Sequence, residues 1–109
     1  MNQKRMDAVP RFANVGTIGA LPGRRDDLLA ILLRRNEALR DVGCLAYEVG
    51  ISEDDLDTIF VVELWDSKEA HTASLRLPQV QAVIEEARPI MSGVYGGYRF
   101  SIAGSPLRD

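Results

Sequence analysis

Residues able to do chemistry gather around one hydrophobic run, TIFVVELWDS, which covers residues 58 to 67 and contains the only tryptophan. Because side chains alternate between the two faces of a strand, Glu63 and Trp65 share a face. A carboxylate in a buried strand is costly unless it is paired, hydrogen-bonded or solvated by a cavity. The pair therefore indicates a pocket with an aromatic wall. The alternative is structural, with Glu63 paired to a helix arginine and Trp65 filling the core.

Four further side chains are candidates for the same pocket. His71 is the only histidine, and an ordinary pKa of about 6.5 suits a general base at neutral pH. Asn14 shares a strand face with Phe12, and its amide can hydrogen-bond a ligand if that face lines a cavity. Tyr47 and Tyr95 can supply hydroxyl groups. Each has an ordinary alternative: an exposed or capping helix histidine, a surface or edge asparagine, and core tyrosines.

Composition limits the classes of protein to consider. A chain of 109 residues suits one domain. Its net charge of −3, without a basic cluster interleaved with aromatics, argues against nucleic acid binding. No apolar run approaches the roughly 20 residues of a membrane-spanning helix, and no secretory signal is recognisable, so we expect a cytoplasmic location. Cys44 is the only cysteine, which disfavours a cysteine-based metal site and suits a small hydrophobic strand residue.

Periodicity along the chain predicts strands and helices in alternation. We expect a domain over residues 12–102, between a flexible arm at 1–11 and a tail at 103–109. The predicted strands cover residues 12–21, 44–52, 58–65 and 90–102, and the middle two form a hairpin across an acidic turn. The predicted helices cover residues 24–41, a segment after Trp65 and residues 78–87. Asp66 is the expected N-cap of the second helix, in a capping box with Glu69, and Pro78 opens the third.

This order of elements is the ferredoxin-like split βαβ pattern of α+β proteins, in which helices cover one face of a four-stranded antiparallel sheet. Apolar residues occur on both faces of the predicted central strand. The face without helices must then be covered, and a second copy packing sheet to sheet would make a symmetric homodimer. Gly16 and Gly19 in the first strand indicate close approach of a backbone or ligand, or a bulge.

Five short motifs strengthen this interpretation by their order and spacing. They are Pro22-Gly23, the segment GCLAYE at residues 43–48, FVVELW at 60–65, SKEA at 67–70, and Leu77-Pro78. Over about residues 12–100 the chain resembles the antibiotic biosynthesis monooxygenase family, whose members are small dimeric α/β barrels and include the quinol monooxygenases.

The resemblance implies oxidation or oxygenation of a quinol or phenolic substrate by dioxygen, with no metal, flavin or haem cofactor, in a pocket between sheet and helices. The strand-end Trp65 matches the family's tryptophan and is expected to form a pocket wall. We predict catalytic roles for His71, Trp65 and Asn14. The residues predicted to contact substrate are Tyr47, Glu63 and Tyr95.

The sequence is also compatible with two other functions. One is a non-catalytic dimeric protein that binds a small hydrophobic molecule. The other is haem degradation, which the same fold supports and for which His71 is the only available histidine ligand. The sequence contains no phosphate-binding glycine loop, no zinc-spaced set of cysteines and histidines, and no serine in a nucleophile elbow.

Overall fold

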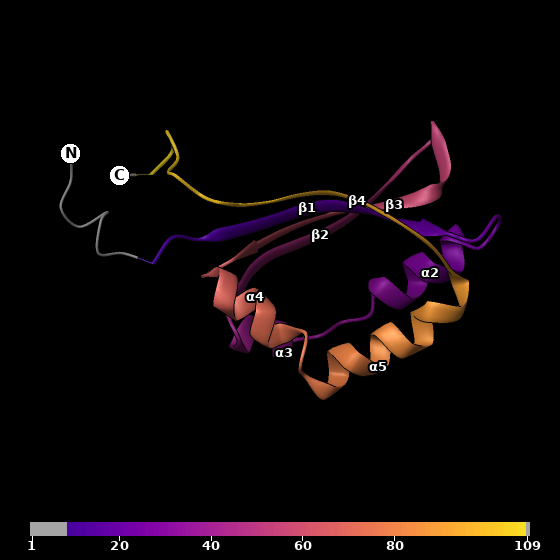
Figure 1. The fold of residues 1–109 in the computed structure, drawn as a ribbon, viewed down its shortest axis with the longest axis horizontal. Helices are drawn as coiled ribbons and strands as arrows, with labels where there is room; N and C mark the ends of the chain where they lie inside the picture. The colour runs from indigo at the N-terminus through magenta and orange to yellow at the C-terminus, as the bar shows by residue number, and fades with distance from the viewer. Residues whose placement is uncertain (1–8, 109) are drawn as a thin grey trace.

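The computed structural model of the chain describes residues 9–108, so most of the predicted N-terminal arm lies outside the described residues. The strands are β1 (Phe12–Ala20), β2 (Cys44–Ser52), β3 (Asp55–Trp65) and β4 (Met91–Ser101). The helices are α2 (Arg25–Leu32), α3 (Ala38–Asp41), α4 (Lys68–Ser74) and α5 (Pro78–Ala87), with a 3₁₀ turn η1 at Arg88–Ile90. The strands form one antiparallel sheet in the order β2-β3-β1-β4, and the helices lie on one side of it (Figure 1). The predicted ferredoxin-like α+β fold is confirmed.

The predicted central strand β3 does lie inside the sheet, between its hairpin partner β2 and β1. Its Ile59 and Val61 side chains face the helices and are buried with Leu28 of α2 and Ala87 of α5. Complete burial of a side chain such as Leu28 stabilises a fold by about 1.5–3 kcal/mol. The core is therefore the layer between the sheet and the helices.

The single helix predicted over residues 24–41 is wrong, because α2 ends at Leu32 and α3 starts only at Ala38. The four residues Arg34 to Glu37 are consecutive polar residues, so a helix through them would present no apolar side chain to the sheet. Asparagine at position 36 also disfavours a helix interior. Gly43, with a φ of +104°, ends the helical region as expected for a C′ glycine.

The cap of α4 also differs from the prediction. Ser67, rather than Asp66, is the N-cap, and its hydroxyl accepts a hydrogen bond of 3.0 Å from the backbone N–H of Ala70. Asp66 instead donates its backbone N–H to the carbonyl of Gly43 at 2.9 Å, which holds the end of β3 beside the start of β2. Pro78 opens α5 at its first position, as predicted.

The glycines of β1 allow the neighbouring edge strand to approach closely. Gly16 lies opposite Gly97 of β4, and a Cβ atom at Gly16 would stand 2.7 Å from the carbonyl oxygen of Gly96. Gly97 has a φ of +124° and its Cβ would collide with the backbone of Val15. Of the explanations offered for Gly16, close approach of another backbone is the one that the structure supports.

Candidate functional site

A cavity of about 1100 Å³ lies between the helix-facing side of the sheet and the helices. Its walls are mainly apolar side chains, among them Ile31 of α2, Val49 of β2 and Ile84 of α5. This volume lies slightly above the usual range for small-molecule sites, which is roughly 300–1,000 Å³. The cavity can therefore hold a ligand with several fused rings.

A row of four polar side chains crosses the sheet on the cavity side. Tyr47 of β2 lies opposite Glu63 of β3, Glu63 lies opposite Asn14 of β1, and Asn14 lies opposite Arg99 of β4. Directly opposed residues of antiparallel strands project to the same face and lie close enough to interact. All four line the cavity. The sheet register thus brings a phenol, a carboxylate, an amide and a guanidinium into one line.

Glu63 is the centre of the site. It is only 7% exposed, and its two oxygens accept hydrogen bonds from different residues. Asn14 Nδ2 donates to Oε2 at 2.6 Å, and Trp65 Nε1 donates to Oε1 at 3.1 Å. Among the residues the structure describes, no arginine pairs with Glu63, so the structural alternative of a helix arginine is not what stabilises it. Two hydrogen bonds to the carboxylate make its burial tolerable.

His71 is buried rather than exposed, at 6%. Its ring lies between two aromatic rings, with centroids 5.5 Å from Phe12 and 5.4 Å from Trp65. Its Nε2 is 3.9 Å from Glu63 Oε1. Burial lowers the pKa of His71, the negative charge of Glu63 raises that pKa in part, and the positive charge of Arg99 lowers it further. The imidazole is therefore mostly neutral at pH 7 and can accept a proton.

The two predicted tyrosines line the same cavity but differ in exposure. Burial, together with the nearby charge of Glu63, raises the pKa of Tyr47 well above its usual value, so its hydroxyl stays neutral as a hydrogen-bonding group. Tyr95 lies on the edge strand β4 opposite Ile18 and is largely exposed. All six predicted site residues thus border one cavity. Four of them, Asn14, Glu63, Trp65 and His71, form one cluster.

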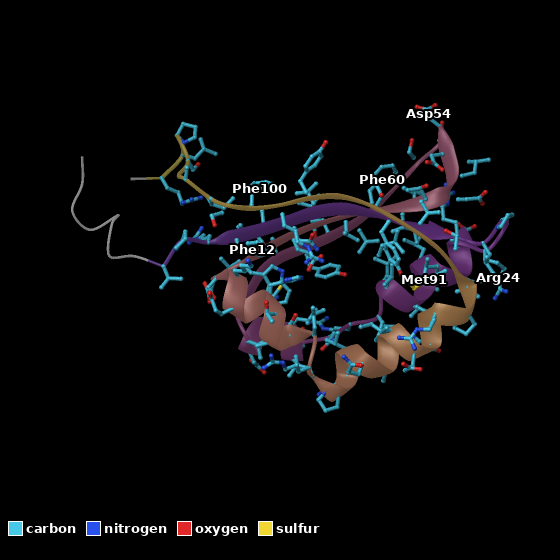
Figure 2. The ribbon with its side chains drawn as sticks, viewed as in Figure 1. Phe12, Arg24, Asp54, Phe60, Met91 and Phe100 are labelled. Atoms are coloured by element: carbon cyan, nitrogen blue, oxygen red, sulfur yellow. The ribbon has the colours of Figure 1, made fainter. Side chains whose placement is uncertain are left out.

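Three residues at the site were not predicted. Phe12 contacts His71, and Figure 2 shows it on the helix side of the sheet, near α4. Buried Ser74 donates its hydroxyl to the backbone carbonyl of His71 at 2.6 Å, which steadies the turn that carries the imidazole. Arg99 joins the polar row. Alternation along β1 could have identified Phe12, since it lies on the same face as Asn14. Arg99 could not be identified in this way, because glycines interrupt β4 and its register with β1 is not evident from the sequence.

Within residues 9–108, no three or more histidine, cysteine, aspartate or glutamate side chains are grouped to hold a metal ion. No helix in this part of the chain is long and apolar enough to cross a membrane. The cytoplasmic location expected from the sequence stays a prediction.

The fold and the cavity together define the class of protein: a ferredoxin-like α+β domain with a cavity between its sheet and its helices. Residues 11–86 match the family model named Antibiotic biosynthesis monooxygenase. The chain belongs to the antibiotic biosynthesis monooxygenase family.

Solved structures agree with this assignment. A protein of Chloroflexus aurantiacus J-10-fl named for the same family is 36% identical, with 87% of this chain and 95% of that chain covered and a TM-score of 0.75. Similarly named proteins of Caulobacter crescentus CB15 and Deinococcus radiodurans share the fold at 19% and 22% identity. The first covers 88% of this chain and 92% of its own with a TM-score of 0.74, the second 86% and 94% with 0.73. No curated protein sequence matches the chain.

Proposed function

We propose that this protein is a monooxygenase that uses dioxygen on a quinol or phenolic aromatic substrate without a resident cofactor. A phenolate is electron-rich enough to transfer an electron to dioxygen itself, and the resulting radical pair can combine to form a C–O bond. A quinol and one dioxygen then give a hydroxyquinone and one water, so that one oxygen atom enters the ring and the other leaves as water. The protein must bind the ring, favour its deprotonated form and exclude bulk water.

The observation that carries this proposal is the cluster of Asn14, Glu63, Trp65 and His71 at the end of an apolar cavity. His71 is neutral and accepts the phenolic proton, since burial lowers its pKa. Glu63 lies close enough to favour the imidazolium that forms. Glu63 accepts hydrogen bonds from both Asn14 and Trp65. It therefore also fixes the orientation of the Trp65 indole, which bounds the substrate ring.

We further propose that the protein acts as a homodimer whose interface is the face of the sheet without helices. In Figure 2, Phe60 and Phe100 lie on the side of the sheet opposite the helices. Val62 lies on the same face as Phe60 and is 49% exposed in the single chain, and Phe100 is 46% exposed. An exposed apolar surface of this kind favours association between copies.

Oxygen consumption by chelator-treated, flavin-free protein tests the catalytic proposal. We expect uptake above the buffer rate with at least one member of a panel of quinols and naphthols, and one atom of ¹⁸O per product molecule from ¹⁸O₂. His71→Gln should lower kcat by about 100-fold, as expected for a general base, while Glu53→Gln at the exposed hairpin turn should not.

Other outcomes separate the competing functions. Hydrogen peroxide in place of labelled product would identify an oxidase and reject the monooxygenase. Uptake equal to the blank for every compound, together with saturable quenching of Trp65 fluorescence by one of them, would instead identify a non-catalytic binding protein.

A further inference from the structure

Arg99 differs from the other arginine at the cavity. Arg34 also lines the cavity, but its guanidinium forms a two-pronged ion pair with Glu86 of α5. Arg99 has no carboxylate within ion-pair distance among residues 9–108. Its side chain is exposed in the single chain and borders the cavity from β4, opposite Asn14. A cation without a protein partner is thus placed beside the polar cluster of the site.

The polar row carries a negative charge at Glu63 and a positive charge at Arg99, with Asn14 between them. Glu63 and Arg99 are two strands apart, which at the usual strand spacing is about 10 Å. Asn14, between them, donates its amide to Glu63. The field of Arg99 reaches the catalytic cluster, since it contributes to lowering the pKa of His71. The same field stabilises negative charge on a ligand that lies between the strand row and α4.

We propose that Arg99 binds the ionised oxygen of the aromatic substrate, so that the site selects phenols in their phenolate form. This inference rests on the proposed function and adds the group that receives the anion. The substrate O–H bond breaks, the proton passes to the imidazole of His71, and the phenolate oxygen pairs with the guanidinium. The two charges produced, imidazolium and phenolate, then face Glu63 and Arg99 respectively. Charge separation on proton transfer is thereby compensated at both ends.

The test uses p-nitrophenol, a phenol too electron-poor to react with dioxygen and one whose ionised form absorbs visible light. Absorbance titration of the bound probe should give a pKa at least about one pH unit below that of the free probe, as expected for a nearby opposite charge. Arg99→Gln should return the pKa to the free value or above it, and Arg99→Lys should keep most of the effect. Arg76→Gln removes the same charge from an exposed position that does not line the cavity, and should behave as wild type.

A neutral analogue, p-nitroanisole, separates anion binding from a structural role. Its affinity, measured by quenching of Trp65 fluorescence, should be the same in wild type and in Arg99→Gln. Equal loss of both ligands in Arg99→Gln, an unchanged pKa of the bound probe in that variant, or no binding of p-nitrophenol to wild type would each overturn the inference. Because the probe is not oxidised, failure of oxygen uptake with a retained pKa effect rejects the catalytic proposal and leaves Arg99 as an anion-binding residue.

Discussion

Trp65 Nε1 donates a hydrogen bond of 3.1 Å to Glu63 Oε1, and the two residues lie two positions apart on the same face of β3. The bond joins the carboxylate to the indole of Trp65, which is itself only 1% exposed, and Asn14 donates to the other carboxylate oxygen. The orientation of the indole therefore depends on an anion that is almost completely buried.

Glu63→Gln should lower the free energy of unfolding by about 1–3 kcal/mol. The amide that replaces the carboxylate has one acceptor oxygen, which can serve Trp65, and its N–H₂ group then requires Asn14 to turn its own amide and accept instead of donate. Two hydrogen bonds to a charged acceptor are thereby replaced by weaker neutral ones. Urea unfolding followed by circular dichroism measures the change. Glu53→Gln, at an exposed position, is the matched control and should stay within about 0.5 kcal/mol of wild type. Equal stability of the two variants would contradict the assigned hydrogen bonds.

Stability should decrease as pH falls from about 6.5, the ordinary histidine pKa, through the lower pKa of folded His71. In this window the unfolded chain binds its proton more tightly than the folded chain, so acid favours unfolding. His71→Gln should remove that part of the pH dependence between pH 8 and 5 in urea unfolding.

The single histidine also permits a direct measurement by NMR. Its ring proton signal should titrate with a midpoint below 6.5, and Arg99→Gln should move the midpoint upward because a lowering charge is lost. A midpoint at or above 6.5 in wild type would show that Glu63, rather than burial, dominates.

Ser67→Ala should destabilise the fold by about 1 kcal/mol, since the backbone N–H of Ala70 loses its side-chain acceptor. Helix α4 carries His71, so the loss should also broaden the histidine NMR signal. Ser67→Asp restores an acceptor at the same place and should retain nearly wild-type stability. If the alanine and aspartate variants unfold at the same urea concentration, the cap is not formed by this hydroxyl.

Gly97→Ala should cost more than 1 kcal/mol, because position 97 has a positive φ and a Cβ would press on the backbone of Val15. Gly50→Ala in β2 is the control, since a Cβ there meets no atom within 4 Å. Thermal unfolding of the two variants should differ by several degrees. Comparable melting temperatures would argue against the tight pairing of β1 and β4.

Val62→Lys should give a monomer. The substitution places a charge in the middle of the sheet face proposed as the interface, where its desolvation opposes association. Light scattering should give twice the chain mass of 12.1 kDa for wild type and 12.1 kDa for the variant. Leu75→Lys adds the same charge on the helix side and should remain dimeric. A monomeric wild-type protein at micromolar concentration rejects the interface.

The sequence by itself determined the elements whose signals are local. Alternation of apolar residues located β2 and β3, a proline located the start of α5, and the order of the elements gave the split βαβ fold. Alternation also placed Glu63 beside Trp65 on one face. Where a local signal was ambiguous the prediction failed: the polar residues after α2 break a helix that periodicity alone would continue, and Ser67 rather than Asp66 caps α4.

Only the tertiary structure decided which residues meet. Asn14, Glu63 and Arg99 are far apart along the chain, and they form a row because the register between strands aligns them. The pairing of β1 with β4 includes the Gly16–Gly97 pair and a register shift between Ile18 and Ala20, and neither can be deduced from one strand at a time. Burial likewise turned His71 from a helix residue of unknown exposure into a neutral imidazole beside a buried carboxylate, because burial and neighbouring charge together set its pKa.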